Sequence, residues 1–165
     1  MTYRIEALPL DPFVPFFSMS DEGLAAIGAR RWVADQTGRA PCRVSLQDAA
    51  AGERLVLVNH AHLTDPGSPY RASGPIFVRE AAVEAGAVEG PAPEMLAKRP
   101  LSLRIYDARN MMIEGEVIDG RDLDDRLAAW FDHPATDQVH IHFAPRGCYL
   151  ARAVRPGPQR PRSTP

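Results

Sequence analysis

Cysteine, excess charge of one sign and long apolar runs are all scarce in this chain. Cys42 and Cys148 are its only cysteines, too few for the disulfide framework of a small secreted domain. We expect both to be free thiols that behave as small buried apolar residues, and whether they are neighbours stays open. No apolar run approaches the ~18–20 residues that a membrane-spanning helix needs. Residues 1–13 carry charges, at Arg4 and Glu6, where a signal peptide would be apolar. The sequence therefore predicts a cytoplasmic protein with no membrane partner.

The charge balance excludes a second class of partner. The chain has 19 basic and 21 acidic residues and a formal net charge of −2, so it lacks the basic excess that nucleic-acid binding requires. A chain of 165 residues buries roughly two-thirds of its unfolded surface, enough for one core without covalent staples. We expect a single globular domain over residues 1–154. Residues 155–165 are rich in proline and arginine and almost free of apolar side chains, which predicts a disordered tail.

Alternation of polar and apolar residues predicts strands along most of the chain. The clearest case is "LSLRIYD", residues 101–107, in which leucine and isoleucine share one face and polar side chains share the other. The strands are mostly consecutive, and this order favours antiparallel pairing because parallel crossovers would need a helix between neighbours. Further strands are expected at residues 3–8, 42–46, 54–60, 75–80, 111–120, 138–144 and 148–154.

One helix has a clear apolar stripe. In residues 122–133, Leu123, Leu127, Trp130 and Phe131 recur at helical spacing, and Pro134 prevents continuation. The expected fold class is therefore α+β: a curved, mostly antiparallel sheet with the 122–133 helix packed on one face.

Two histidines stand out in the strand "VHIHF" because alternation places His140 and His142 on one face and the apolar residues on the other. This His-X-His spacing puts the two imidazoles ~6–7 Å apart along the strand. Three interpretations follow: a polar surface or interface, a site for ligand binding or acid–base catalysis, and a divalent metal site.

A metal site would need a third ligand, and the sequence offers several. Cys148 follows in the next strand, and Cys42 and the pair His60 and His62 are further candidates. No carboxylate stands at a recognisable ligand spacing and no Cys-X-X-Cys motif is present, so the metal and any cofactor stay open. Cys148 beside a histidine would also suit nucleophilic catalysis, since a neighbouring imidazolium favours the thiolate. The candidate catalytic residues are His140, His142 and Cys148.

A second polar group lies in "SPYRASGPIFVRE". A loop that carries Tyr70, Arg71 and Ser73 leads into a strand that contains Arg79. The planar guanidinium fork suits a carboxylate or phosphate, although Arg71 or Arg79 could instead form a structural ion pair with Glu80 or Glu53. The polar face of residues 101–107 adds two more side chains. The candidate ligand-binding residues are Tyr70, Arg71, Ser73, Arg79, Arg104 and Tyr106.

Four segments, "PCRVSL", "GERLVLVNH", "SPYRASGPIFVRE" and "VHIHFAPRGCYLARA", resemble the bacterial family catalogued as domain of unknown function 1203. The resemblance runs from about residue 3 to residue 154. It implies a small stand-alone bacterial domain and brings no activity, substrate or cofactor with it.

Three hypotheses of function follow from these residues. The first is a cytoplasmic domain that binds a small anionic or polar metabolite in a pocket lined by histidine, arginine and tyrosine, with histidine as an acid–base catalyst. The second is a homodimeric interaction module without enzymatic activity, which would use its polar sheet face or an exposed edge. The third is a metal-binding protein that uses His140 and His142. Whether the protein is an enzyme stays open at this stage.

Overall fold

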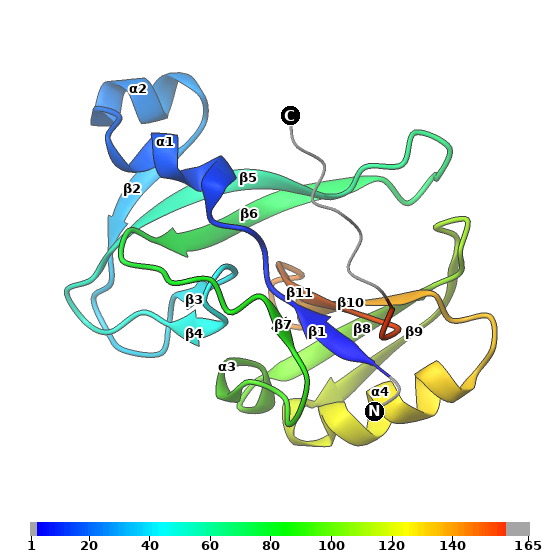
Figure 1. The fold of residues 1–165 in the computed structure, drawn as a ribbon. Helices are drawn as coiled ribbons and strands as arrows, with labels where there is room; N and C mark the ends of the chain where they lie inside the picture. Colours follow the sequence, from blue (N-terminus) through cyan, green and yellow to red (C-terminus); the bar gives the residue numbers. More distant parts are fainter. Residues whose placement is uncertain (1–2, 158–165) are drawn as a thin grey trace.

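Two sheets and a few short helices make up the protein, which is α+β and mostly antiparallel as expected (Figure 1). The structure is a computed structural model and describes residues 3–157, so most of the expected tail, from residue 158 on, lies outside the described residues. Among these residues no helix is long and apolar enough to cross a bilayer. The prediction of one sheet is wrong, because the hairpin over residues 54–79 does not join the strands that follow it. It builds a second sheet around its own buried cluster of valine and isoleucine side chains.

The larger sheet has six strands, all paired antiparallel. Its order is β7 (Ala87–Val88), β1 (Arg4–Glu6), β11 (Tyr149–Val154), β10 (Gln138–Phe143), β8 (Pro100–Tyr106) and β9 (Met112–Asp119).

The smaller sheet has five strands around the long hairpin of β5 and β6. Its order is β2 (Arg30–Val33), β5 (Arg54–Leu63), β6 (Ala72–Arg79), β3 (Pro41–Cys42) and β4 (Gln47–Asp48), with β3 parallel to β6. The predicted strand over residues 42–46 is wrong beyond Cys42. The chain turns there, with Leu46 at a φ of 50°, so that β4 can fold back on β3.

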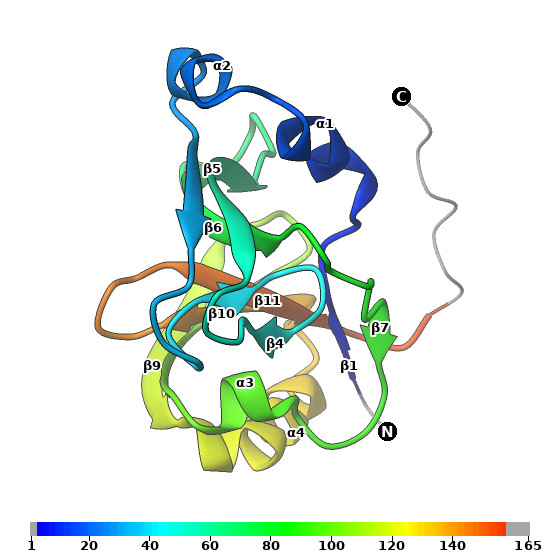
Figure 2. The same cartoon turned by 90° about the vertical axis from the view of Figure 1, so that its left-hand side faces the viewer.

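The helices are short. They are η1 (Asp11–Phe13), α1 (Val14–Phe17), α2 (Asp21–Ala26), α3 (Glu94–Ala97), η2 (Gly120–Asp122) and α4 (Leu123–Asp132). Leu123, Leu127 and Phe131 of α4 are buried in the same cluster as Leu103 of β8 and Ile141 of β10. In Figure 2, α4 lies below the six-stranded sheet and the β5–β6 hairpin lies above it.

A buried arginine ties the two sheets together. The side chain of Arg43, which follows β3, is only 3% exposed, and its Nε donates to the carbonyl oxygen of Tyr149 at 2.8 Å. A second donor of the same guanidinium reaches the carbonyl oxygen of Pro41. The start of β11 is thereby fixed under the five-stranded sheet.

Gly120 allows η2 to pack directly on the backbone of α3. A Cβ atom at this position would lie 2.2 Å from the carbonyl oxygen of Leu96 and 2.6 Å from that of Arg99. Both are backbone atoms at the end of a short helix and cannot move aside cheaply. Only glycine fits this contact.

We expect Gly120→Ala to lower the free energy of unfolding by about 1–3 kcal/mol, the usual cost of forcing extra atoms into a filled contact. Gly74→Ala is the matched control, because a Cβ there has no atom within 4 Å. It should stay within about 0.5 kcal/mol of the parent. Denaturant unfolding of both variants checks this, and equal stabilities would contradict the tight contact.

Candidate metal centre

The histidine face of β10 is an interior face. Alternation places His140 and His142 opposite Val139 and Ile141, as predicted, but both imidazoles are 0% exposed. The β5–β6 hairpin of the other sheet lies over β10 (Figure 1), and the ring of His62 on β5 contacts both imidazoles. The interpretation of this strand as an exposed polar surface is therefore wrong.

A β-bulge brings a third histidine to this pair. On β5, Ala61 pairs with Ser73 and Leu63 pairs with Ala72, so His62 is the extra, unpaired residue. Bulges redirect side chains and often lie beside functional sites. The ring of His62 is 5.6 Å from that of His140 and 5.1 Å from that of His142, measured between centroids. Of the candidate third ligands that the sequence offers, His62 is the one that joins the cluster.

The three imidazoles present ring nitrogens to one another. One nitrogen from each ring lies within 4.8 Å of the other two. Three buried ring nitrogens have no hydrogen-bond partner: Nδ1 of His62, Nδ1 of His140 and Nε2 of His142. A tetrahedral zinc ion with Zn–N bonds of 2.0–2.1 Å needs nitrogens about 3.4 Å apart. Small side-chain rotations would therefore close the cluster around an ion.

The opposite ring nitrogens of two histidines have partners. Nδ1 of His142 lies 2.9 Å from the carbonyl oxygen of Gly147, and Nε2 of His140 lies 3.2 Å from Oε1 of Gln138. An oxygen acceptor at each of these atoms favours the tautomer that carries its proton there. The unpartnered nitrogen of each ring then holds a lone pair, the form that a metal ion binds.

Tyr149 lies against all three rings and was missed from the sequence. Its ring stacks on His62 at 5.0 Å and lies 5.5 Å from His140 and 5.7 Å from His142. A bulge at Leu150 turns it toward the histidines, since Ile141 pairs with Ala151 but His142 pairs with Tyr149. Burial raises the pKa of this phenol far above its usual range, so it stays neutral. No pattern in the sequence reveals such a bulge.

Burial also keeps the histidines neutral. It lowers the pKa of His62 to about 4 and the pKa of His140 and His142 each to about 3, with smaller contributions from neighbouring positive charge. Among the charged neighbours is Arg104, which pairs directly across from His140 on β8. Neutral imidazole is the state in which histidine ligates metals.

Two of the predicted ligand-binding tyrosines extend the site along β8. The ring of Tyr106 lies 4.9 Å from His140, and Tyr70 lies 6.2 Å beyond it in an edge-on contact. Arg104 shares this side of the sheet with Tyr106 and forms no salt bridge within residues 3–157.

The comparison with protein families agrees with the resemblance seen in the sequence. The family model described as "Protein of unknown function (DUF1203)" matches residues 39–155, more than half of the chain. The chain belongs to this family. No curated protein and no solved structure matches the chain. The part that defines a DUF1203 domain includes all three clustered histidines and Tyr149, but neither β1 nor the N-terminal helices.

The structure does not bring all of the predicted ligand-binding residues to the histidine cluster. Arg79 points to the other face of β6 and binds Glu53 at 2.5 Å, the structural ion pair that was the alternative interpretation. Ser73 shares that outer face and is exposed, and Arg71 is an exposed residue before β6. Strand alternation separates them from His62, so the prediction that Arg79 lines the histidine pocket is wrong.

The two thiols also lie outside the histidine cluster. Cys148 is half-buried in the turn before β11, and its Sγ donates only to the carbonyl oxygen of Arg146, at 3.9 Å. Cys42 is buried and accepts from the backbone nitrogen of Arg79. Both are free, as expected, and neither is among the residues that could hold a metal with the histidines in the described part of the chain.

A pocket of about 250 Å³ opens onto the histidine cluster from one side. His60, His62, Tyr149 and Arg152 line it, together with Glu6, which forms a salt bridge to Arg152 at 2.7 Å. His60 is half-buried, and its burial lowers its pKa. The pocket gives His62 and Tyr149 a route to solvent.

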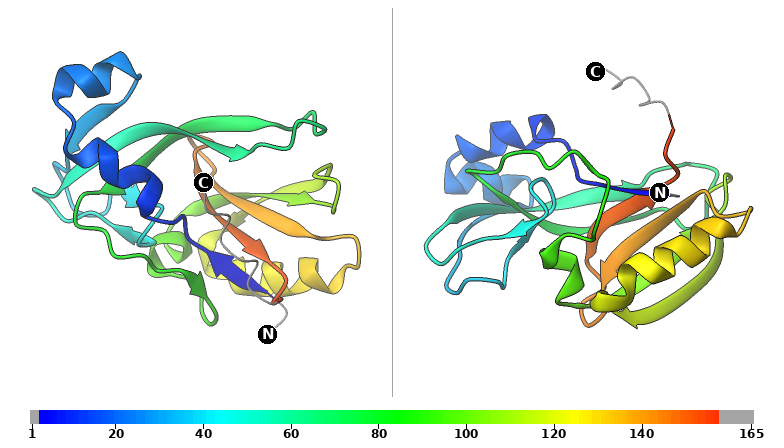
Figure 3. Two further views of the ribbon diagram at one scale, coloured as in Figure 1. Left: turned by 45° about the horizontal axis from the view of Figure 1, so that its top comes forward. Right: turned by 60° about the horizontal axis from the view of Figure 1, so that its bottom comes forward.

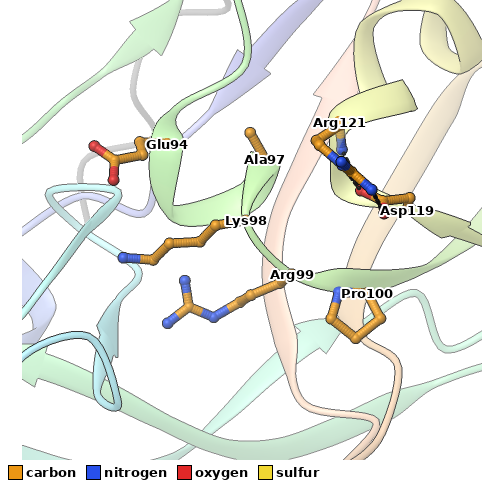
Figure 4. Close-up of a pocket in the computed structure, with 7 residues that line it drawn as sticks. All are labelled: Glu94, Ala97, Lys98, Arg99, Pro100, Asp119 and Arg121. Carbon is orange, nitrogen blue, oxygen red and sulfur yellow. Dashed lines mark hydrogen bonds and ion pairs between the residues drawn. The ribbon is translucent and has the colours of Figure 1, made fainter.

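A larger pocket of about 500 Å³ lies away from the histidines, between α3 and η2 (Figure 4). Its cations already have partners. Asp48 binds both Lys98 and Arg99, and Asp119 binds Arg121. These ion pairs account for the charges of the pocket without a ligand.

We expect the metal-free DUF1203 domain to lose stability on mild acidification. Between pH 6.5 and about pH 4 the unfolded chain protonates His62, His140 and His142 while the folded chain does not, so the unfolded state binds more protons. Unfolding free energy should therefore fall as the pH drops from 6.5, by up to ~1.4 kcal/mol per pH unit for each histidine. Above pH 7 these three histidines should add no pH dependence to the unfolding free energy.

Denaturant unfolding with a chelator present, at pH values from 7.5 to 5, measures this slope. His142→Gln is the comparison variant and should show a shallower slope, because it carries one fewer buried imidazole. The same slope in both proteins would contradict the neutral, buried state of the cluster.

Proposed function

We propose that this protein binds one divalent transition-metal ion through His62, His140 and His142, and that the ion acts on a small anionic or polar metabolite. The observation that carries the proposal is the cluster of His62, His140 and His142, in which one nitrogen of each ring lies within 4.8 Å of the other two and each ring has a buried nitrogen without a hydrogen-bond partner. An unsatisfied buried polar atom costs about 1–3 kcal/mol. A shared metal ion would satisfy all three atoms at once.

The ligand set indicates which ions to test. Imidazole suits zinc, copper, iron and nickel, and the cluster contains no carboxylate or thiol within the described residues. Three histidines with a free fourth position are typical of catalytic zinc sites, whereas structural zinc sites have four protein ligands. A zinc ion so bound lowers the pKa of its water to ≈ 7, which would suit hydrolysis or hydration of a substrate.

The surrounding structure would hold the ligands firmly. We include in the proposal that α4 packs on the face of the six-stranded sheet opposite the histidines, since Leu127 and Phe131 share a buried cluster with Val139 and Ile141. A ligand strand supported by a packed core loses little entropy on binding an ion. Neither ligand strand is an edge strand, because β10 lies between β11 and β8 and β5 lies between β2 and β6.

Arg104 supports the anionic part of the proposal. It stands beside His140 across the β8–β10 pair, while Arg152 stands on the other side of His140 on β11. Arg152 forms a salt bridge to Glu6, which also binds Arg4, whereas Arg104 has no carboxylate partner within residues 3–157 and hydrogen-bonds to the phenol of Tyr106. A guanidinium without a carboxylate partner, next to a metal centre, would suit a carboxylate or phosphate group on the substrate. Tyr106 and Tyr70 would border the same group.

The homodimer is the second candidate, in a changed form. The histidines cannot hydrogen-bond across an interface because they contact one another inside one chain. The free edge of β2 supports association instead, since Trp32 is 46% exposed and Val33 is 56% exposed there. Sedimentation at several protein concentrations tests whether the chain forms a dimer.

A bacterial source, a cytoplasmic location and the absence of a nucleic-acid partner remain part of the proposal, as does a domain over residues 1–154.

We expect the purified protein to bind one zinc or cobalt(II) ion per chain. Each of the variants His62→Gln, His140→Gln and His142→Gln should weaken binding by more than the roughly 10–100-fold that follows loss of an outer hydrogen-bond partner. Competition titration with a chromogenic chelator measures the zinc affinity, and the visible spectrum of the cobalt form reports the coordination number.

His133→Gln is the control for this series, because His133 is an exposed histidine at the end of α4. It should bind zinc as the parent does. A parent protein without stoichiometric binding, or one whose affinity survives loss of any clustered histidine, would contradict the proposed centre.

We expect Arg104→Gln to weaken binding of inorganic phosphate to the zinc-loaded protein by about 10-fold, or about 1.4 kcal/mol, the scale of one charged hydrogen bond. Arg121→Gln is the matched control, since Arg121 is exposed and pairs with Asp119 far from the histidines. Calorimetric titration measures both. Equal affinities would remove Arg104 from the substrate site.

A further inference from the structure

A chain of hydrogen bonds runs from His140 to the tip of the β5–β6 hairpin. Gln138 accepts at Oε1 from the His140 ring and donates from Nε2 to Oδ1 of Asn110, at 2.6 Å. Asn110 in turn donates from Nδ2 to Oδ2 of Asp65, at 2.7 Å. Gln138 and His140 are almost fully buried, whereas Asp65 lies at the surface end of the chain of bonds.

The carboxylate determines the direction of every bond in this chain. A carboxylate only accepts, so Asn110 must turn its amide NH₂ toward Asp65 and its oxygen toward Gln138. Gln138 must then turn its NH₂ toward Asn110 and its oxygen toward His140. That oxygen can only accept, so His140 must carry its proton on Nε2.

We infer that Asp65, acting through Asn110 and Gln138, is a positioning residue that holds His140 in the tautomer with a free lone pair on Nδ1. This is the nitrogen that lacks a hydrogen-bond partner in the histidine cluster. The consequence for metal affinity rests on the proposed function, but the control of the tautomer does not, since it operates in the metal-free protein.

The same contacts also position His62. Asn110 lies in the turn between β8 and β9 at a φ of 57°, a left-handed conformation that asparagine tolerates. Its carbonyl oxygen accepts from Oγ of Ser68 at 2.6 Å, so the turn is bound to the hairpin tip by its backbone and its side chain. Figure 3 shows this tip and the β8–β9 turn side by side in both views. Asp65 is three residues after His62 on that hairpin, and the two histidine-bearing sheets are joined at this point.

The hydrogen bonds to Asp65 favour its charged form. The Asn110 side chain and the backbone nitrogen of Gly67 both donate to it and lower the pKa of this carboxyl, with a smaller contribution from Arg71. Arg71, a predicted ligand-binding residue, thus acts on the outer end of this chain of bonds. Outer partners of a ligating histidine typically account for a 10–100-fold difference in metal affinity.

The decisive variant is Asp65→Asn, which keeps the shape of the side chain and removes its acceptor-only character. An asparagine there can keep an oxygen for the backbone nitrogen of Gly67 only if it turns its NH₂ toward Asn110, and this orientation reverses the direction of the chain of bonds. Long-range ¹H–¹⁵N correlation spectra of histidine-labelled, metal-free protein report the tautomer directly. We expect His140 of the parent to carry its proton on Nε2 and the variant to shift toward the tautomer with its proton on Nδ1, because Gln138 would then present its NH₂ to Nε2. In competition titration the variant should bind zinc 10–100-fold more weakly.

Two further variants distinguish a change in the direction of the hydrogen bonds from a general disruption of the structure. Asp119→Asn removes another surface carboxylate, one that pairs with Arg121, and should leave the His140 tautomer and the zinc affinity unchanged. Asp65→Asn combined with Gln138→Glu moves the acceptor-only group next to His140 and should return its proton to Nε2. Failure of this double variant to restore the tautomer would overturn the inference.

The possible results distinguish the inference from the proposed function. A parent protein that binds no zinc but whose tautomer depends on Asp65 would refute the metal centre and support the inference. If the three histidines bind zinc but parent and Asp65→Asn show the same His140 tautomer and the same zinc affinity, the result would support the metal centre and refute the inference about Asp65. A parent His140 with its proton on Nδ1 would refute the inference outright.

Discussion

Three neutral imidazoles packed between two sheets are the constraint on which the surrounding structure depends. Burying a polar ring is favourable only if its nitrogens are satisfied or bind a ligand, and burying it charged is far costlier. The protein keeps these histidines uncharged because the β5–β6 hairpin covers His140 and His142, and because His62, which belongs to that hairpin, stacks against Tyr149. The polar face of the six-stranded sheet, which carries His140 and His142, is therefore a second interior beside the apolar cluster that α4 shares with β8 and β10.

Such an interior needs the two sheets to be held in register, and polar contacts do this rather than a continuous hydrophobic layer. Arg43 binds the backbone of Tyr149 at one end of the hairpin, and Asn110 binds Asp65 and Ser68 at the other. The buried guanidinium forms no salt bridge within residues 3–157, and burial lowers the pKa of Arg43 to about 10. These contacts are directional, so they fix the sheets at the separation that the packed imidazole and phenol rings occupy.

Much of the local structure could be predicted from the sequence, and much of the site could not. Side-chain period alone places His140 and His142 on one face, and their ring centroids are 6.2 Å apart, close to the spacing expected along a strand. The period does not say what covers that face, because this depends on how distant segments pair. For the same reason Arg79 was assigned to the pocket although its strand turns it outward to Glu53.

The bulges are the other feature that the sequence does not reveal. Each depends on a one-residue difference in length between paired strands, which has no composition or period of its own. His62 was recognisable as a candidate ligand by residue type, but not as the one that meets the pair. Tyr149 gave no signal, since a regular strand would have sent it to a different side of the sheet from the one it occupies. Family membership adds boundaries to this picture but no chemistry.

His62 is supernumerary in the backbone ladder that carries it. Without it, Ala61 and Leu63 would follow one another and face Ser73 and Ala72 in unbroken succession. The hairpin thus needs this residue for none of its strand pairs. The bulge therefore separates the pairing of the hairpin from the third imidazole of the cluster. Deletion of this one residue would leave the pairs of β5 with β6 in unbroken succession and the cluster with two imidazoles in place of three.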